Sequence, residues 1–344
     1  MLMAYRYPPE WHPQDWLWIG FPHDESEWSG VLEQAQEQIA AFANAVAESG
    51  QEVRLIVRDD ANEERARSLV SSAVKLEKRI FGDIWLRDTG PIIMADEQGR
   101  RVARRFGFNG WGGKYLMPGD LAIGAVLANS AGMEALTSDW VLEGGAIDHD
   151  GKGFAVTTEQ TLLNPNRNPE LDRDAIGARL ARDFGFAKLL WLGDGLMNDH
   201  TDGHVDNLAR FVGPGTLAVP TPAGDDDPNA EVYRDAYERA EAAGGITVRE
   251  VPSPGRFEVD GKIEPASYVN FAITNKLIVV PTFGVANDDE AVAAIDALFP
   301  DRETIGLPSE AVLKGGGGFH CACQQMPMPF GADEADDEEG GNRK

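Results

Sequence analysis

The chain has 344 residues, with 31 Lys or Arg against 57 Asp or Glu, which gives a formal net charge of −26. This excess of acid excludes a general nucleic-acid binder, which needs a basic face, and it opposes binding to anionic membranes. It favours solubility and attracts cationic partners. Hydrophobic residues make up 42% of the chain, so it can bury the core of one large α/β domain or of two smaller domains.

Short apolar strands and amphipathic helices alternate along the chain. Apolar runs predict strands at residues 16–21, 53–57, 189–192 and 277–281, and apolar residues at helical spacing predict helices at residues 28–47, 231–242 and 291–299. Helical segments that begin near Met117, Pro169, Asn229 and Asp288 recur roughly every 50–60 residues, which indicates repeated units of several strands and one helix. Such units could close around an axis, and one doubly wound sheet is the alternative.

The acidic C-terminal segment and the two cysteines indicate which part of the chain is disordered and in which cellular compartment the protein lies. Residues 332–344 read ADEADDEEGGNRK, and like charges in such a block repel one another, so we expect a disordered tail. Cys321 and Cys323 lie too close together to close a useful loop, which argues against a disulfide scaffold and favours a reducing compartment. We see no signal peptide and no run of about 18 apolar residues that would predict a membrane span, so we expect a cytoplasmic protein.

Four consecutive glycines, residues 315–318, stand just before Phe319, His320 and Cys321. Glycine lets the backbone approach a ligand closely, and a cysteine after such a turn can be exposed and activated as a thiolate nucleophile. The alternative is a surface loop followed by two small buried side chains, because cysteine often behaves as a small hydrophobe.

The segment 198–207, NDHTDGHVDN, contains two histidines and three aspartates. Imidazole titrates near neutral pH, so His204 or His200 could transfer protons. A polar turn rich in capping residues is the alternative. The two histidines could also join Cys321 and Cys323 in a tetrahedral metal site, but a helix is unfavourable across 200–204 and the C-x-C spacing is tighter than in usual zinc sites.

Two further motifs place carboxylates beside turns. In DIWLRDTGP, residues 83–91, Asp88 follows an aromatic residue and an arginine and could anchor a cation. In VLEGG, residues 141–145, Glu143 could point into a cleft. A simple turn is the alternative interpretation for both motifs. The chain contains neither G-x-S-x-G nor a P-loop motif, which excludes the corresponding hydrolases and nucleotide-binding proteins.

Taken together, these segments supply one thiol, one imidazole and three carboxylates, from Cys321, His204, Asp88, Glu143 and Asp206. Carboxylates gathered in one cleft are costly unless a cation joins them. A planar guanidinium matches bidentate carboxylates well, and a thiolate beneath it could attack its central carbon.

In combination and order, the motifs resemble those of the agmatine deiminase family, within the guanidine-modifying pentein superfamily. The segments that carry the resemblance are WLRDTGP (85–91), FNGWGGKY (108–115), LEGG (142–145), LLNPNRNP (162–169), TDGHVDN (201–207) and GGGGFHC (315–321). The resemblance implies an α/β fold, a five-bladed α/β propeller of ββαβ-type repeats with pseudo-fivefold symmetry. It also implies a single catalytic domain over residues 1–331 and a reaction without a cofactor.

The resemblance further implies that a small cationic guanidino compound is the substrate, and a homo-oligomer is compatible with it. Cys321 would be the nucleophile and His204 the general acid and base. Agmatine would become N-carbamoylputrescine and ammonia through a covalent thiouronium on the sulfur of Cys321.

Substrate binding would fall to four side chains under the same resemblance. Asp88 and Asp206 would hold the guanidinium nitrogens, and Trp85 would flank the substrate. Glu143 would either orient the catalytic histidine or hold the guanidinium from another side.

One departure from the family concerns the far end of the substrate. His200 stands where the family has an acidic residue, and Asp199 or Asp202 is close enough in sequence to replace that acid, of which we expect Asp199 to bind the substrate. A deiminase for peptidylarginine or a small arginine derivative stays open, because Arg87, Arg167 or Arg210 could bind a carboxylate. A non-catalytic metal-binding protein is the third hypothesis.

Overall fold

Residues 5–330 are the part of the chain that the computed structural model describes, so the tail expected at 332–344 lies outside the described residues. The first sheet joins both ends of this part. Its order is β18 (Cys323–Pro327), β1 (Gln14–Gly20), β2 (Glu52–Val57) and β3 (Val74–Lys78), with α1 (Leu32–Glu48) and α2 (Asp60–Leu69) as crossovers. The strand β18 runs antiparallel to β1, and the other pairs are parallel.

Four further sheets repeat one order of three strands, in which the first pair is antiparallel and the second is parallel. A parallel pair needs a long crossover, and a helix supplies it in each sheet. The first unit contains β4 (Ile92–Ala95), β5 (Arg101–Gly107), α5 (Asp120–Ser130) and β6 (Glu134–Val141), and the second contains β7 (Asp148–His149), β8 (Phe154–Thr158), α7 (Arg173–Phe184) and β9 (Lys188–Leu192). The third unit contains β10 (Arg210–Gly213), β11 (Thr216–Thr221), α8 (Ala230–Ala242) and β12 (Thr247–Pro252). The fourth contains β15 (Ala272–Ile273), β16 (Leu277–Thr282), α9 (Asp288–Asp296) and β17 (Glu303–Pro308). The doubly wound sheet is therefore wrong, and the α/β class is confirmed.

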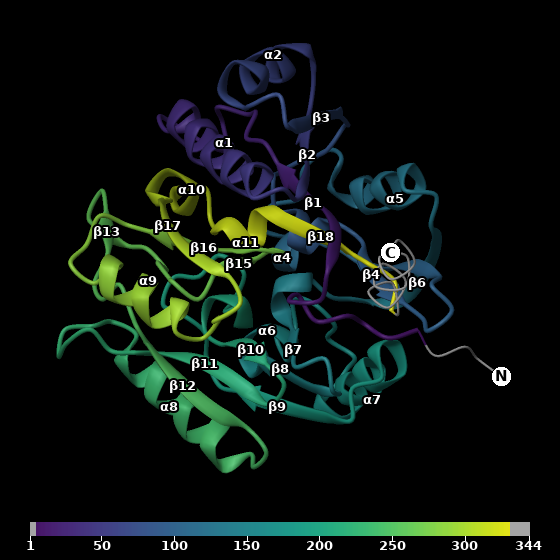
Figure 1. The fold of residues 1–344 in the computed structure, drawn as a ribbon. Coiled ribbons are helices and arrows are strands. Elements are labelled where there is room, and N and C mark those ends of the chain that lie inside the picture. The colour runs from purple at the N-terminus through teal and green to yellow at the C-terminus, as the bar shows by residue number, and fades with distance from the viewer. Residues whose placement is uncertain (1–4, 331–344) are drawn as a thin grey trace, which may run out of the picture.

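The remaining elements are short. They are α3 (Leu86–Thr89), α4 (Gly110–Gly113), η1 (Gly144–Ala146), α6 (Glu159–Leu162), η2 (Val205–Asn207), the hairpin β13 (Glu258–Val259) and β14 (Lys262–Ile263), α10 (Glu310–Lys314) and α11 (Phe319–Ala322). In Figure 1 the longer helices α1, α5, α7, α8 and α9 lie around the periphery, whereas α4 and α11 lie near the middle.

The predicted strands are confirmed, with ends that shift by one or two residues. The helix predicted at 28–47 begins later, at Leu32, because the carbonyl of Asp24 accepts hydrogen bonds from the amides of Glu27 and Trp28 in a preceding turn. The helical start predicted near Asp288 is confirmed, and this helix ends at Asp296 rather than at residue 299. Three acids fill its first turn, where they interact favourably with the positive end of the helix dipole.

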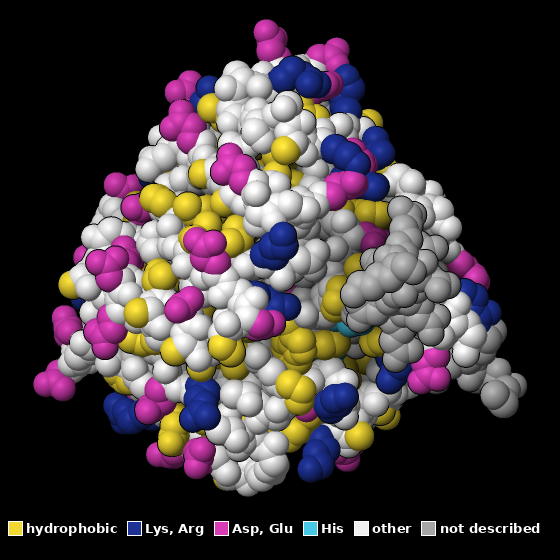
Figure 2. Space-filling model, in the orientation of Figure 1, with side chains coloured by type: hydrophobic (Ala, Val, Ile, Leu, Met, Phe, Trp, Pro, Cys, Tyr) yellow, Lys and Arg dark blue, Asp and Glu magenta, His cyan; other side chains and the backbone are white. Residues whose placement is uncertain are grey.

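The largest hydrophobic cluster surrounds the first sheet and includes Trp18, Phe42 and Phe319. Phe319 packs on Phe42 with ring centroids 4.9 Å apart, which anchors α11 in the core. Burial of each such ring stabilises the fold by roughly 1.5–3 kcal/mol. On the face in Figure 2, Asp and Glu side chains are scattered over the periphery with Lys and Arg among them. Within residues 5–330 no helix is long and apolar enough to cross a membrane.

Candidate active site

The motifs found in the sequence occupy one recurring position in the fold. Asp88 lies just before β4, Glu143 before β7, Asp206 before β10 and Cys321 before β18, the first strand of each sheet. Asn270 holds the same position before β15, although no motif drew attention to it. The repeat thus brings five side chains from distant parts of the sequence to equivalent places.

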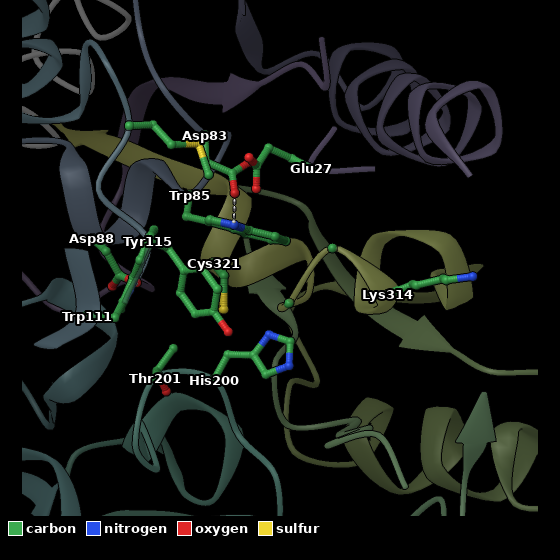
Figure 3. A pocket seen from close by; sticks show the side chains of 13 residues that line it. Glu27, Asp83, Trp85, Asp88, Trp111, Tyr115, His200, Thr201, Lys314 and Cys321 are labelled. Carbon is green, nitrogen blue, oxygen red and sulfur yellow. Dashed lines mark hydrogen bonds between the residues drawn. The ribbon is translucent and has the colours of Figure 1, made fainter. Parts of the chain in front are cut away.

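A cavity of about 140 Å³ lies beside this group, and Cys321 and Asp88 are part of its wall. Trp85, Trp111 and Tyr115 supply aromatic surfaces, and Figure 3 shows the sulfur of Cys321 among them. The indole N–H of Trp85 donates to Asp83 Oδ2 at 2.7 Å, which fixes the ring. The expected position of Trp85 beside the substrate cavity is consistent with this wall.

Cys321 is buried, and only 5% of it is exposed. Its Sγ lies 3.1 Å from Asn270 Nδ2 and 3.5 Å from Asp206 Oδ2. Burial raises the pKa of this thiol well above its usual value, and the carboxylates of Asp206 and Asp88 raise it further. The raised pKa favours the thiol form of Cys321, and a nearby cation would favour the thiolate.

Asp88 has both oxygens occupied by fixed donors. Oδ2 accepts from Trp111 Nε1 at 2.8 Å, and Oδ1 accepts from the amide of Gly145 at 2.9 Å. Burial raises the pKa of this carboxyl to about 8, and the charges of Asp206 and Glu143 contribute to the rise. Ionisation of Asp88 at neutral pH is therefore unfavourable unless a cation binds next to it.

Asp206 has one engaged and one free oxygen. Oδ2 faces His320 Nδ1 at 2.7 Å, whereas Oδ1 is buried without a hydrogen-bond partner among the described residues. Burial alone would raise the pKa of Asp206, but the contact with His320 lowers it below its ordinary value. This carboxylate is ready to accept a donor.

Glu143 is paired with an arginine. Arg167 Nε donates to its Oε1 at 2.8 Å, and both side chains have 0% exposure. Its other oxygen, Oε2, is buried and finds no hydrogen-bond partner within the described part of the chain. Burial raises the pKa of Glu143, and Arg167 opposes that rise.

His204 is completely buried, and neither ring nitrogen has a hydrogen-bond partner within residues 5–330. Its Nδ1 lies 3.7 Å from Asp88 Oδ2. Burial lowers the pKa of His204 to about 3, so the ring is neutral at pH 7. The orientation of His204 by Glu143 stays a prediction, because Glu143 Oε1 accepts from Arg167 and no hydrogen bond joins Glu143 to His204 among the described residues.

Gly145 shows how tightly these groups converge. A Cβ built on this residue would lie 2.7 Å from His204 Nδ1, 2.9 Å from Asp206 Oδ2 and 3.1 Å from Asp88 Oδ1. The absence of a side chain at this position lets an imidazole and two carboxylates meet around one point of the backbone.

The residues expected at the far end of the substrate lie differently. Asp199 Oδ1 accepts from the amide and hydroxyl of Thr201, and its Oδ2 accepts from Asn207 Nδ2. Its role in substrate binding stays a prediction. His200 lines the cavity and is exposed. In the described residues, no group of three or more His, Cys, Asp or Glu side chains could hold a metal ion.

The three arginines expected to be available for a carboxylate are engaged elsewhere, which corrects that expectation. Arg87 donates to Gln324 and Gln325, and the guanidinium of Arg210 binds Glu10 and Asp148. All three arginines are buried, and none is among the described residues that line the cavity.

Sequence reasoning assigned no role to several contributors. The clearest are Asn270 and His320, which contact the proposed nucleophile and Asp206. Arg167 was considered only as a partner for a substrate carboxylate, and it pairs with Glu143 instead. Asn270 could have been found from its place in the repeat, and His320 and Arg167 stood inside quoted motifs.

A buried thiol beside carboxylates with free oxygens is typical of a cysteine-dependent enzyme that acts on a cation. The family model for Porphyromonas-type peptidyl-arginine deiminases matches residues 6–327, so the chain belongs to that family. The chain is 34% identical to an agmatine deiminase of Pseudomonas aeruginosa, with 95% of this chain and 96% of that protein covered. The resemblance seen in the motifs is confirmed.

Solved structures agree with this placement. An agmatine deiminase of Enterococcus faecalis is 30% identical with a TM-score of 0.88, and the match covers 94% of this chain and 96% of that one. A Cys-to-Ser variant of the C. jejuni agmatine deiminase with substrate bound is 30% identical with a TM-score of 0.89, covering 95% and 97%.

Proposed function

We propose that this protein is an agmatine deiminase that hydrolyses agmatine to N-carbamoylputrescine and ammonia without a cofactor. The observation that carries the proposal is a set of buried atoms without a hydrogen-bond partner among the described residues, namely Glu143 Oε2, Asp206 Oδ1 and both nitrogens of His204. The thiol of Cys321 lies 3.5 Å from the other oxygen of Asp206. Such atoms cost free energy unless a ligand supplies donors and charge. A guanidinium supplies both, and the names of the relatives support agmatine as its source.

In the first half-reaction the guanidinium lies between Asp88, Asp206 and Glu143. Its charge favours the thiolate, and the thiol proton of Cys321 passes to the neutral ring of His204. The thiolate forms a C–S bond to the central carbon, and a tetrahedral adduct results. His204 returns the proton to one nitrogen, the C–N bond breaks, and ammonia leaves with the electron pair.

The second half-reaction starts from the S-alkylthiouronium on Cys321. His204 takes a proton from water, and the hydroxide adds to the same carbon. The C–S bond then breaks, the electron pair returns to sulfur, and the hydroxyl proton of the product passes to solvent. His204 returns the proton that it took from water to the Cys321 thiolate, which restores the starting thiol and the neutral ring. Splitting the hydrolysis into two steps with one covalent intermediate lowers each barrier.

The far ammonium of agmatine would face the acidic end of the cavity. Glu27 and Asp83 both line it, and in Figure 3 their carboxylates lie near one another above Trp85. Burial raises the pKa of Asp83 to about 7, and neighbouring acids including Glu27 contribute. Lys314 also lines the cavity, but its ammonium binds Asp260 at 3.1 Å. This end favours an amine over the carboxylate of arginine.

The test is turnover of agmatine, arginine and a blocked peptidylarginine by the purified protein, followed as ammonia and ureido product. We expect turnover of agmatine well above that of the other two. A preference for peptidylarginine, or no turnover of any of the three, would overturn the proposal.

The acidic end is tested with Glu27→Gln. We expect a several-fold higher KM for agmatine with kcat little changed, and no effect on propylguanidine, which lacks the amine. Glu33→Gln, which alters an exposed acid in the first turn of α1, is the matched control. An equal effect on both substrates would contradict this assignment.

We also propose that the five sheets are the blades of a propeller with pseudo-fivefold symmetry, and that residues 1–331 form one catalytic domain. The common strand order of the sheets and the peripheral helices support this arrangement. A cytoplasmic location, which the two free thiols support, and a homo-oligomer complete the proposal.

A further inference from the structure

The ring of His320 lies between two carboxylates. Its Nδ1 is 2.7 Å from Asp206 Oδ2, and its Nε2 is 2.8 Å from Glu10 Oε2. All three residues are buried, with exposures of 4% for His320, 0% for Asp206 and 8% for Glu10. Both distances are those of charge-assisted hydrogen bonds, so each needs a proton between its two atoms.

The number of protons needed for these two hydrogen bonds indicates the protonation state of His320. An ionised carboxylate only accepts hydrogen bonds, and a neutral imidazole has a single N–H to donate. The pKa of Glu10 would be raised by burial but is lowered overall, first by Arg210 and then by His320 and Arg87. The pKa of Asp206 is also lowered, so both carboxylates are ionised and both protons belong to the ring.

Two arginines hold the far side of Glu10. Arg210 Nη2 lies 2.6 Å from Glu10 Oε2, and its Nε lies 3.0 Å from Asp148 Oδ2. Arg87 Nη2 lies 3.8 Å from Glu10 Oε2. Burial raises the pKa of Asp148, and Arg210 opposes that rise. Glu10 is therefore the carboxylate that these guanidiniums hold ionised beside the ring.

The other titratable neighbours are uncharged at neutral pH. Burial raises the pKa of Cys323, whose Sγ lies near Arg87, to about 12, and it raises the pKa of Tyr7 as well. Burial lowers the pKa of His204, which faces Asp206 from the substrate side. The thiol of Cys321 contacts the same Asp206 oxygen that His320 holds.

We propose that His320 is a positioning residue, an imidazolium held between two carboxylates that keeps Asp206 ionised and directs its free oxygen toward the substrate cation. Asp206 Oδ2 is occupied by His320, which leaves the buried Oδ1 for a guanidinium nitrogen. The reference to substrate rests on the proposed function, whereas the protonation of the ring does not. Glu10 does not contact the substrate in this proposal; it accepts a hydrogen bond from the other nitrogen of the His320 ring and so fixes the ring.

The protonation state is tested by ¹⁵N NMR of the ligand-free protein labelled at its six histidines. We expect one buried ring with both nitrogens protonated at pH 7, and we expect this signal to disappear in His320→Asn. A His320 ring with one bare nitrogen at pH 7 would overturn the proposal. The wild-type spectrum gives this answer even if agmatine is not the substrate.

The positioning role is tested by the pH dependence of kcat/KM in His320→Asn. Asparagine offers an amide donor toward Asp206 but carries no charge, so Asp206 should hold its proton to higher pH. We expect the acid limb to move up by at least about one pH unit, because an adjacent opposite charge shifts a carboxyl pKa by that much or more. Glu10→Gln should bring the His320 signal into titration near neutral pH. Activity reduced equally at every pH would mean a merely structural role and would contradict the proposal.

Discussion

Arg167 and Glu143 form an ion pair with no exposed surface, in which Arg167 Nε donates to Glu143 Oε1 at 2.8 Å. The same guanidinium donates to the carbonyl of Thr201 at 2.7 Å and pairs with Asp202. One arginine from the LLNPNRNP segment therefore ties the carboxylate before β7 to the loop that carries His204.

We expect Arg167→Met to lower the free energy of unfolding by about 3–5 kcal/mol, because it leaves a buried carboxylate without its partner. Urea unfolding measures the loss. The control is Arg179→Met, which removes a partly exposed pair with Asp139 and should cost about 1 kcal/mol or less. Equal losses in the two variants would contradict the structural role of Arg167.

Substitutions of the two cysteines should have very different effects on activity. Cys321→Ser should lower agmatine turnover by several orders of magnitude, because a hydroxyl at neutral pH is a far poorer nucleophile than a thiolate. Cys323→Ala should keep most activity, because Cys323 is buried in β18 and contacts Arg87 and the carbonyl of His320. Assays of ammonia release check both variants, and comparable losses would mean that the nucleophile is misassigned.

Gly145→Ala should abolish turnover while the chain still folds. The new methyl would lie within about 3 Å of His204, Asp206 and Asp88, so at least one of them must move, and small misplacements of catalytic groups are costly. Gly177→Ala is the control, since a Cβ there meets no atom within 4 Å on helix α7. That variant should keep activity and gain roughly 0.5–1 kcal/mol of stability. Retained turnover in Gly145→Ala would contradict the packing.

Binding of agmatine should release protons at pH 7. Burial raises the pKa of Asp88 to about 8, so this carboxyl is mostly protonated at pH 7, and a bound guanidinium would ionise it. In the Cys321→Ser variant, the affinity should rise from pH 6 to pH 8 and then level off. Calorimetry in buffers of different ionisation enthalpy counts the protons, and a binding enthalpy independent of buffer would contradict this prediction.

The same pKa has a consequence for folding. An unfolded aspartate ionises near pH 4, whereas folded Asp88 keeps its proton to about pH 8. The folded state therefore binds more protons in this window, and the contribution of Asp88 to stability falls as pH rises from about 4 to about 8. Bound agmatine should restore the stability that is lost when Asp88 ionises.

The sequence alone determined the strands, the main helices, the family and the side chains that carry the proposed chemistry. Apolar periodicity and contiguous motifs encode these features locally, so Cys321, His204 and Asp88 could be chosen without coordinates. The contact partners of those residues are not local. Asn270 stands 51 residues before Cys321, and Glu10 stands 310 residues before His320.

Only the tertiary structure decided which polar groups are paired and which are left free. It engages Arg87, Arg167 and Arg210 with buried partners. Within residues 5–330, Asp206 Oδ1, Glu143 Oε2 and the ring of His204 have no hydrogen-bond partner. The net charge of −26 does not show which acids bind a cation. The structure identifies them as the buried carboxylates, whose ionised forms are unfavourable without a nearby cation. Burial and pairing depend on segments that meet only when the chain has folded, which is why composition and motifs could not specify them.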